Sequence, residues 1–348
     1  MERTEYVETG LIALDDIRAA ADRIAPRGAV SGTGGADGAD GAGGRGVMRT
    51  PLLPMPVVRG GPPLWLKAEN LQPVGSFKIR GATNALSLLD DEARAAGVVT
   101  HSSGNHGRAL AYAARAVGVA CVVVVPEGAP QVKTDAMREL GAEVVIVTPA
   151  QRSETARRLA GERGLTLIPP FDDDAVIAGQ GTVGLEILED LPAVDTVLLP
   201  VGGGGLASGV ATAVKELKPD AAVIGVEPEL AADAAESLAV GRRIAWSPER
   251  TARTAADGVR VGLSDRTFAH LRERLDDILT VTEEEIRAAM GRIARRARVV
   301  AEPSGALAAA AVLSGRAPAG NTVAVVSGGN VDPVLLAATV LTGQSDDL

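Results

Sequence analysis

Aromatic side chains are scarce in this chain, since only 2% of its 348 residues are Phe, Trp or Tyr. Because 46% of the residues are nonetheless hydrophobic, a large core must be built mainly from Ala, Val, Leu and Ile. There is one cysteine, Cys121, which excludes internal disulfides and cysteine metal clusters. It lies within an apolar run, so we expect a buried, inert thiol.

Positively charged residues are also fewer than negatively charged ones. The formal net charge is −9, with 35 Lys and Arg against 44 Asp and Glu. This balance argues against binding to nucleic acids or anionic membranes. No apolar run approaches the roughly 20 residues that span a bilayer, and the N-terminus has no apolar signal core. The sequence therefore predicts a soluble, cytoplasmic protein without nucleic-acid or membrane partners.

The order of patterns along the chain predicts an α/β architecture. Residues 11–25 have helical periodicity, and the Gly-, Ala- and Asp-rich residues 28–46 predict a flexible insertion. Beyond it, helical patterns alternate with eight predicted strands, at 98–100, 121–125, 144–147, 165–168, 196–200, 222–226, 278–281 and 322–326. Apolar strands separated by helices are typical of parallel sheets covered on both faces. We expect two α/β domains with an active site in the cleft between them.

A lysine stands at the start of a predicted helix in PVGSFKIRG, residues 73–81. Lysines are normally exposed, but Lys78 follows Gly, Ser and Phe directly. Burial or a nearby positive charge lowers the pKa of a lysine, as a Schiff-base lysine requires. The alternative is a solvated lysine that merely begins a helix.

Four consecutive glycines, Gly202 to Gly205, lie between a predicted strand and a helix. Glycines let the backbone approach an anion, and a helix N-terminus offers free N–H groups. We expect a phosphate site here rather than a tight turn, which would not need four glycines.

Two cofactor classes fit this loop. Its glycine spacing, with Glu227 at the end of the next strand, matches a dinucleotide fingerprint and suggests a nicotinamide-dependent dehydrogenase. That choice leaves Lys78 unexplained. Pyridoxal 5'-phosphate (PLP) needs a Schiff-base lysine, a phosphate cup and a partner for its pyridine nitrogen, so it accounts for both motifs.

Two further loops follow predicted strands. The SSGNH segment at 102–106 offers hydroxyls, an amide and N–H groups at a helix start, which suit a carboxylate; an ordinary helix cap is the alternative. In AVVSGGNVDP, residues 324–333, Ser327 is a candidate partner for the pyridine nitrogen, or a simple turn serine.

Together, GSFKIRGA, SSGNHG, PVGGGGLASG and SGGNVD resemble, in this order, the fold type II PLP enzymes. Within them, the match is to the serine/threonine dehydratase (ammonia-lyase) and serine racemase branch, over roughly residues 49–341. The resemblance implies the tryptophan synthase β-like fold. Its large PLP-binding domain would comprise 47–96 and 171–348, with 1–27 as an N-terminal helix segment, and its small domain would comprise 97–170.

The resemblance also implies a role for each matching residue. Lys78 would hold the cofactor and remove the substrate Cα proton, and Ser103 would serve the opposite face of Cα in a racemase. The cofactor would contact Phe77, Lys78, Asn105, Gly202, Gly203, Gly204, Gly205, Leu206, Gly258 and Ser327. The substrate would contact Ser102, Ser103, Gly104, Asn105 and His106. Glu227, the carbonyl of Ala231, and Asp233 would bind Mg²⁺ or Ca²⁺.

The reaction implied by the resemblance follows from Ser327. A hydroxyl cannot keep the pyridine nitrogen protonated, so the ring is a weaker electron sink, and loss of a β-hydroxyl is favoured over transamination. We expect β-elimination of water from a small hydroxy amino acid, L-threonine or L-serine, giving a 2-oxo acid and ammonia. Ser103 leaves open a serine racemase or a threo-3-hydroxyaspartate dehydratase. The family's common homodimer is also expected.

Overall fold

The computed structural model describes residues 10–25, 46–56, 64–129 and 131–342. Nearly all of the insertion predicted at 28–46 lies outside these residues. The helix predicted at 11–25 is present as α1, Leu14–Ile24. No helix in the described part of the chain is long and apolar enough to span a bilayer.

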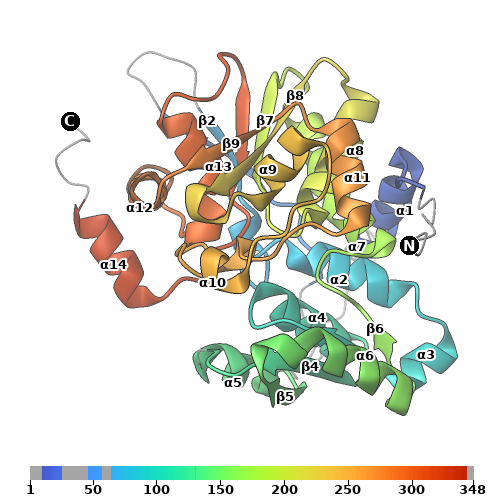
Figure 1. Cartoon of the computed structure of the whole chain (residues 1–348). Coiled ribbons are helices and arrows are strands. Elements are labelled where there is room, and N and C mark those ends of the chain that lie inside the picture. The colour runs from blue at the N-terminus through green and yellow to red at the C-terminus, as the bar shows by residue number, and fades with distance from the viewer. Residues whose placement is uncertain (1–9, 26–45, 57–63, 130, 343–348) are drawn as a thin grey trace, which may run out of the picture.

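Two sheets organise the chain (Figure 1). The larger has the strand order β1-β2-β10-β7-β8-β9 and the smaller has the order β5-β4-β3-β6. All neighbouring strands pair in parallel except β1 and β2. The strands are β1 Leu52–Met55, β2 Leu64–Lys67, β3 Val98–His101, β4 Cys121–Pro126, β5 Glu143–Val147, β6 Thr166–Leu167, β7 Thr196–Pro200, β8 Ala222–Pro228, β9 Asp277–Val281 and β10 Thr322–Val325.

Helices connect and cover these strands. The remaining α-helices are α2 Lys78–Ser87, α3 Asp91–Ala96, α4 Asn105–Ala116, α5 Gln131–Glu139, α6 Arg152–Arg163, α7 Asp174–Asp190, α8 Gly205–Leu217, α9 Asp233–Val240, α10 Pro248–Thr251, α11 Asp265–Arg274, α12 Glu283–Arg292, α13 Pro303–Leu313 and α14 Pro333–Thr342. The smaller sheet thus uses strands from residues 98–167, and the larger uses strands on either side of that range. This arrangement supports the predicted small domain at 97–170, which stays a proposal.

Strand β7 shows why the central strands are apolar throughout. Leu198 packs in the core shared with α12 and α13, whereas Val197 and Leu199 pack in the core shared with α8 and α11. Successive residues of a strand face opposite sides of a sheet, so helices cover both faces of the larger one. Nearly all of α13 is buried, and its alanines let it lie close to the strands despite the scarcity of large side chains.

The eight predicted strands are all present, one of them, 196–200, with the predicted bounds and the others with ends shifted by one or two residues, and the prediction of parallel α/β sheets is confirmed. The strand predicted at 165–168 is shorter, at Thr166–Leu167. Sequence analysis missed β1 and β2. Strand β1 contains Pro54 and pairs antiparallel at the edge of the sheet, where a strand tolerates proline. The thiol of Cys121 is buried as predicted, and burial raises its pKa to about 12.

Helix α2 joins the two halves of the molecule (Figure 1). Ile79 and Ala82 pack in the core of the smaller sheet with Leu110 of α4. The opposite side of α2 packs against α7 and carries Arg80. Any group at the start of α2 therefore lies where the two sheets meet.

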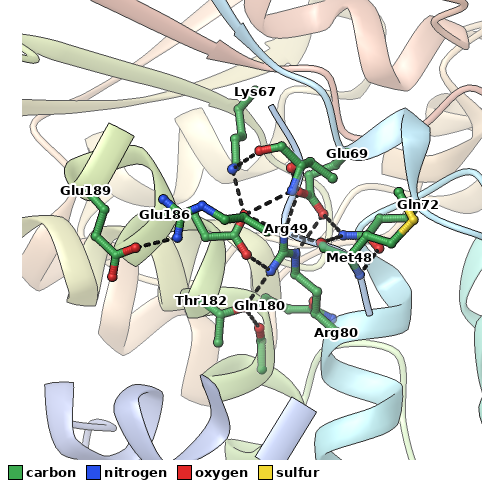
Figure 2. Close-up of polar contacts among 12 residues, drawn as sticks. Met48, Arg49, Lys67, Glu69, Gln72, Arg80, Gln180, Thr182, Glu186 and Glu189 are labelled. Carbon is green, nitrogen blue, oxygen red and sulfur yellow. Dashed lines mark hydrogen bonds and ion pairs between the residues drawn. The ribbon is translucent and has the colours of Figure 1, made fainter. Parts of the chain in front are cut away.

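A buried charge network anchors this side of α2 (Figure 2). Arg80 donates hydrogen bonds to both oxygens of Glu69, at 2.7 and 2.8 Å, and to both oxygens of Glu186, at 2.7 and 2.9 Å. The ammonium of Lys67 lies 2.6 Å from Glu186 and 2.6 Å from the carbonyl oxygen of Thr50. Burial favours a neutral Arg80, but Glu69 and Glu186 outweigh that effect and raise its pKa. The network thus ties α2 to β2, α7 and the chain before β1.

Candidate active site

Lys78 is the first residue of α2. Its Nζ donates a 2.6 Å hydrogen bond to the carbonyl oxygen of Pro170 and lies 5.0 Å from the centroid of the Phe77 ring. Burial lowers the pKa of Lys78 to about 8. An amine with this pKa is neutral in a substantial fraction of molecules at neutral to mildly alkaline pH. The geometry thus favours a nucleophilic amine over a solvated lysine.

The glycine loop lies between β7 and α8. Gly204 has φ of +85° and is the N-cap of α8, and no side chain caps this helix. A Cβ on Gly203 would lie 2.3 Å from the ring of Phe171, and one on Gly202 would lie 2.7 Å from the Cα of Val259. Larger residues are therefore excluded, and the uncapped N–H groups of α8 remain available for a phosphate.

The glycine loop and Lys78 share a neighbour. Phe171, which packs on Gly203, directly follows Pro170, which accepts the hydrogen bond from Lys78. The segment 170–171 therefore brings the predicted lysine and the predicted phosphate loop to one place, although Lys78 and Gly202 are 124 positions apart in the sequence.

Ser327 lies beside Phe77, the residue before Lys78, and is connected to Gly258 through Ser304. The backbone N–H of Phe77 donates to the carbonyl oxygen of Ser327 at 3.1 Å. The hydroxyl of Ser327 donates to the carbonyl oxygen of Ser304 at 3.5 Å, and the Ser304 hydroxyl accepts from the N–H of Gly258 at 2.9 Å. Three of the predicted cofactor residues, from distant parts of the sequence, are thus connected.

The SSGNH loop ends at the start of α4, whose N-cap is Gly104. No side chain caps this helix, so the alternative of an ordinary helix cap is not what the structure shows. The Ser102 hydroxyl accepts from the N–H of Gly104 at 3.2 Å. Ser103 lies between them, partly exposed. The start of α4 therefore offers free N–H groups beside two hydroxyls, which suits a carboxylate.

His106 lies deeper in the same helix. It is buried, and its Nε2 lies 3.1 Å from the carbonyl oxygen of Ile168. Burial lowers the pKa of His106 to about 3, and the nearby Lys78 charge adds to this effect. The ring is thus neutral at neutral pH, and its closeness to Lys78 places the loop at the same site.

Two side chains at this site were not predicted from the sequence. The Nδ2 of Asn105 donates to Oε1 of Glu302 at 2.6 Å, and its Oδ1 accepts from Nδ2 of Asn330 at 2.8 Å. Glu302 is only 4% exposed. One sequence signal could have drawn attention to Glu302: it is an acid between an apolar segment and an alanine-rich helix, with no basic residue beside it.

The predicted cation ligands form a separate cluster at the end of β8. Glu227 accepts from the N–H groups of Ala234 and Ala235, at 3.1 and 2.8 Å. One oxygen of Asp233, Oδ2, is buried and has no hydrogen-bond partner among the described residues. Ala231 is also buried here, in the short 3-10 helix Glu229–Ala231. Burial, together with Asp233, raises the pKa of Glu227 to about 8.

This cluster has the chemistry of a hard-cation site. Two buried carboxylates, one with an unpartnered oxygen, are costly without a positive charge. Within the described ranges, no group of three or more His, Cys, Asp or Glu residues gathers to hold a metal. The carboxylates of Glu227 and Asp233 would therefore be completed by backbone carbonyls and water, as Mg²⁺ and Ca²⁺ sites allow.

Comparison with known proteins identifies the family of this chain. A family model described as "Pyridoxal-phosphate dependent enzyme" matches residues 44–328. The chain belongs to this family. The resemblance predicted from the four motifs is therefore confirmed, and the membership sets aside the nicotinamide-dependent alternative. The poised Lys78 and the uncapped glycine loop fit this cofactor.

Three similar proteins show how broad the activities in this group are. The chain is 41% identical over 307 residues to the L-threo-3-hydroxyaspartate ammonia-lyase of Saccharomyces cerevisiae, covering 86% of this chain and 93% of that protein. It is 42% identical over 297 residues to the serine racemase of Arabidopsis thaliana, covering 82% and 89%. The solved T.th. threonine deaminase is 45% identical, with a TM-score of 0.81 and coverage of 92% and 99%. The predicted fold type II architecture is confirmed.

Proposed function

We propose that this PLP-dependent enzyme eliminates water from L-threonine and L-serine, releasing a 2-oxo acid and ammonia. The observation that supports elimination is Ser327, a buried serine whose carbonyl oxygen accepts from the N–H of Phe77, next to Lys78. A serine there leaves the pyridine nitrogen without the carboxylate partner that would hold a proton on it. Direct loss of the β-hydroxyl is then favoured over transamination.

Different residues of the site would bind the cofactor, bind the substrate and transfer the proton. PLP, when bound, supplies the electron sink that makes the substrate Cα–H bond acidic. The neutral amine of Lys78 would take that proton at Nζ. The N–H groups at the start of α8 would hold the phosphate. The backbone N–H groups at the start of α4, that of Asn105 included, would orient the substrate carboxylate together with the Ser102 hydroxyl, and the side-chain amide of Asn105 would contact the ring hydroxyl of PLP.

A substrate panel tests this proposal. Purified holoenzyme is given L-threonine, L-serine, D-serine and threo-3-hydroxyaspartate, and 2-oxo acid, ammonia and amino-acid enantiomers are measured. We expect equal amounts of 2-oxo acid and ammonia from L-threonine and L-serine. Turnover confined to threo-3-hydroxyaspartate, or D-serine formed faster than 2-oxo acid from L-serine, would contradict the proposal.

Racemisation is the second candidate activity, and Ser103 favours it. A racemase needs a proton donor on the face of Cα opposite Lys78, and Ser103 lies in the candidate carboxylate loop. We expect Ser103→Ala to lower racemisation of L-serine by about 10²-fold or more, and to change dehydration of L-serine only a few-fold. Both rates are measured on the same protein.

The neighbouring serine is a matched control for that experiment. Ser102→Ala removes a hydroxyl assigned to the carboxylate, so it should lower both rates together. If Ser103→Ala lowers racemisation and dehydration by equal factors, Ser103 acts in binding and not as a second acid–base group.

We further propose that Glu227, Ala231 and Asp233 hold Mg²⁺ or Ca²⁺ as a structural and activating ion. A cation present at about 100 times its dissociation constant stabilises a protein by about 2.7 kcal/mol, which predicts a thermal unfolding midpoint about 4 °C higher. Asp233→Asn should remove this response, because it takes away the unpartnered carboxylate. Asp265→Asn, at an acid that is 87% exposed, should keep it. A rise of equal size in both variants would place the cation elsewhere.

A homodimer is part of the proposal as well. Helix α14 is almost wholly apolar, yet Val334 and Leu341 are 78% and 66% exposed. Large exposed apolar side chains on one helix are typical of a surface that is covered in an assembly.

A further inference from the structure

The side-chain amide of Asn105 is held at both ends. Asn330 donates to its Oδ1 at 2.8 Å, and its Nδ2 donates to Glu302 at 2.6 Å. An amide nitrogen carries two protons, and only one of them is used by Glu302. The second proton is available to a ligand, and its direction depends on which way the amide is turned.

The orientation of this amide is dictated by groups further along the chain of contacts. Arg108 can only donate, and its Nη1 lies 2.8 Å from Oδ1 of Asn330. The carbonyl oxygen of Val74 can only accept, and it lies 2.9 Å from Nδ2 of Asn330. Asn330 must therefore present its amino group to Asn105, which in turn must present its own amino group to Glu302.

Glu302 is the last acceptor of this chain, and its carboxyl group is packed closely against the backbone of Gly328. A Cβ on Gly328 would lie only 2.2 Å from Oε1 of Glu302, so the carboxyl group occupies the space beside this glycine. The carboxyl group lies just ahead of α13. The negative charge of Asp257, which is paired with Lys133, also acts on it.

The charge of this carboxyl group is set by its surroundings. Burial raises the pKa of Glu302 to about 8 and Asp257 adds to this, whereas Asn105, Lys133 and the backbone of Asn330 oppose it. Near neutral pH the group is thus largely a neutral acid. Its carbonyl oxygen can still accept a hydrogen bond, so an amide should serve in its place.

We propose that Glu302 is a positioning residue: by accepting one Nδ2 proton of Asn105, it turns the other proton toward the ring hydroxyl of bound PLP. This inference rests on the proposed function. It adds that the fixed direction of hydrogen bonding, from Arg108 through Asn330 and Asn105 to Glu302, is what presents Asn105 to the cofactor.

A double-mutant cycle on cofactor affinity tests the proposal. Apo forms of the wild type, E302L, N105A and E302L/N105A are titrated with PLP, followed by protein fluorescence and by the visible absorption of the bound cofactor. One lost hydrogen bond of this kind is expected to weaken PLP binding about tenfold in E302L and in N105A. The double variant should bind no more weakly than N105A, because Glu302 acts only through that amide.

The conservative variant separates positioning from charge. E302Q keeps an acceptor oxygen without a carboxylate, so it should recover most of the affinity that E302L loses. The proposal is overturned if the losses in E302L and N105A multiply in the double variant, if E302L binds PLP as tightly as the wild type, or if E302Q is as weak as E302L.

The experiment also gives an answer if E302L does not fold or if the wild type does not bind PLP. If E302L does not fold, N330A removes the other tether of the same amide, and it should weaken PLP binding without adding to N105A; multiplied losses there would overturn the proposal equally. If the wild type takes up no PLP at all, the proposed function fails together with this inference. A wild type that binds PLP with independent losses rejects the inference alone.

Discussion

Replacing Lys78 by alanine should lower the release of 2-oxo acid from L-threonine by about 10³-fold or more. In the proposed function, this single change removes both the amine that would hold the cofactor and the group that would take the Cα proton. After borohydride reduction, the wild type should carry PLP on the peptide that contains residue 78, and the variant should carry none. Initial rates and peptide mass spectrometry provide the two measurements.

The pH dependence of cofactor capture gives the same residue a second test. If Lys78 anchors the cofactor as proposed, its neutral amine would be the reactive form, so the rate of PLP capture by the apoprotein should rise as Lys78 loses its proton. Because burial lowers the pKa of Lys78 to about 8, this rise should level off above about pH 8. A solvated lysine, with a pKa near 10.4, would show a rate still increasing at pH 9 and 10.

A matched control for the alanine variant is Lys78→Arg, which keeps a positive charge and a long side chain but cannot supply a neutral amine. It should be as inactive as the alanine variant, although it retains non-covalent cofactor binding at the phosphate loop. Substantial activity in either variant would contradict the assignment of Lys78 as both cofactor anchor and base.

How far the sequence predicts this site depends on the range of the interactions. Lys78, the glycine loop and the SSGNH loop each lie where a strand or loop meets a helix, and the backbone chemistry of such ends can be recognised from adjacent residues. Glu302 acts on Asn105 from 197 residues away. No local pattern contains that contact, so it is visible only once β10 and α13 have been brought beside α4.

The same limit explains the missed elements of the fold. Strand β2 is short and ends in Lys67, a residue that normally indicates solvent. This lysine is fully buried because Glu186, 119 residues later, provides a carboxylate at 2.6 Å. The GSFKIRGA motif contains Arg80, to which the sequence analysis assigned no role. Its two carboxylate partners come from η1, Glu69–Leu71, and from α7, which only the folded chain brings together.

Replacing Arg80 by methionine should lower the free energy of unfolding by about 3 kcal/mol or more. Methionine fills much of the same volume, so the loss comes mainly from charge. Glu69 is fully buried and would keep a carboxylate with no positive partner, and Glu186 would keep only Lys67. The midpoint of urea unfolding of the apoprotein measures the change.

A surface pair is the control for this prediction. Arg158 and Glu162 form an ion pair on α6 in which both side chains are more than half exposed. Exposed pairs contribute about 0.5 kcal/mol or less, so Arg158→Met should leave the midpoint nearly unchanged. Adding Glu69→Gln to the Arg80 variant should recover part of its stability, because it removes the unpaired charge. Equal midpoints for the Arg80 and Arg158 variants would show that the buried network does not stabilise the fold.

The Arg80 variant should also capture PLP more slowly, although the side chain of Arg80 lies in the charge network of Figure 2 and not beside Lys78 Nζ. Lys78 begins the helix that Arg80 anchors, two residues earlier, so a loosened α2 moves the amine relative to Pro170 and the glycine loop. Glu69→Gln in the double variant relieves the unpaired charge but does not restore the anchor. Stability should therefore recover in that variant more fully than the rate of cofactor capture. This difference would distinguish the contribution of Arg80 to stability from its contribution to the position of Lys78.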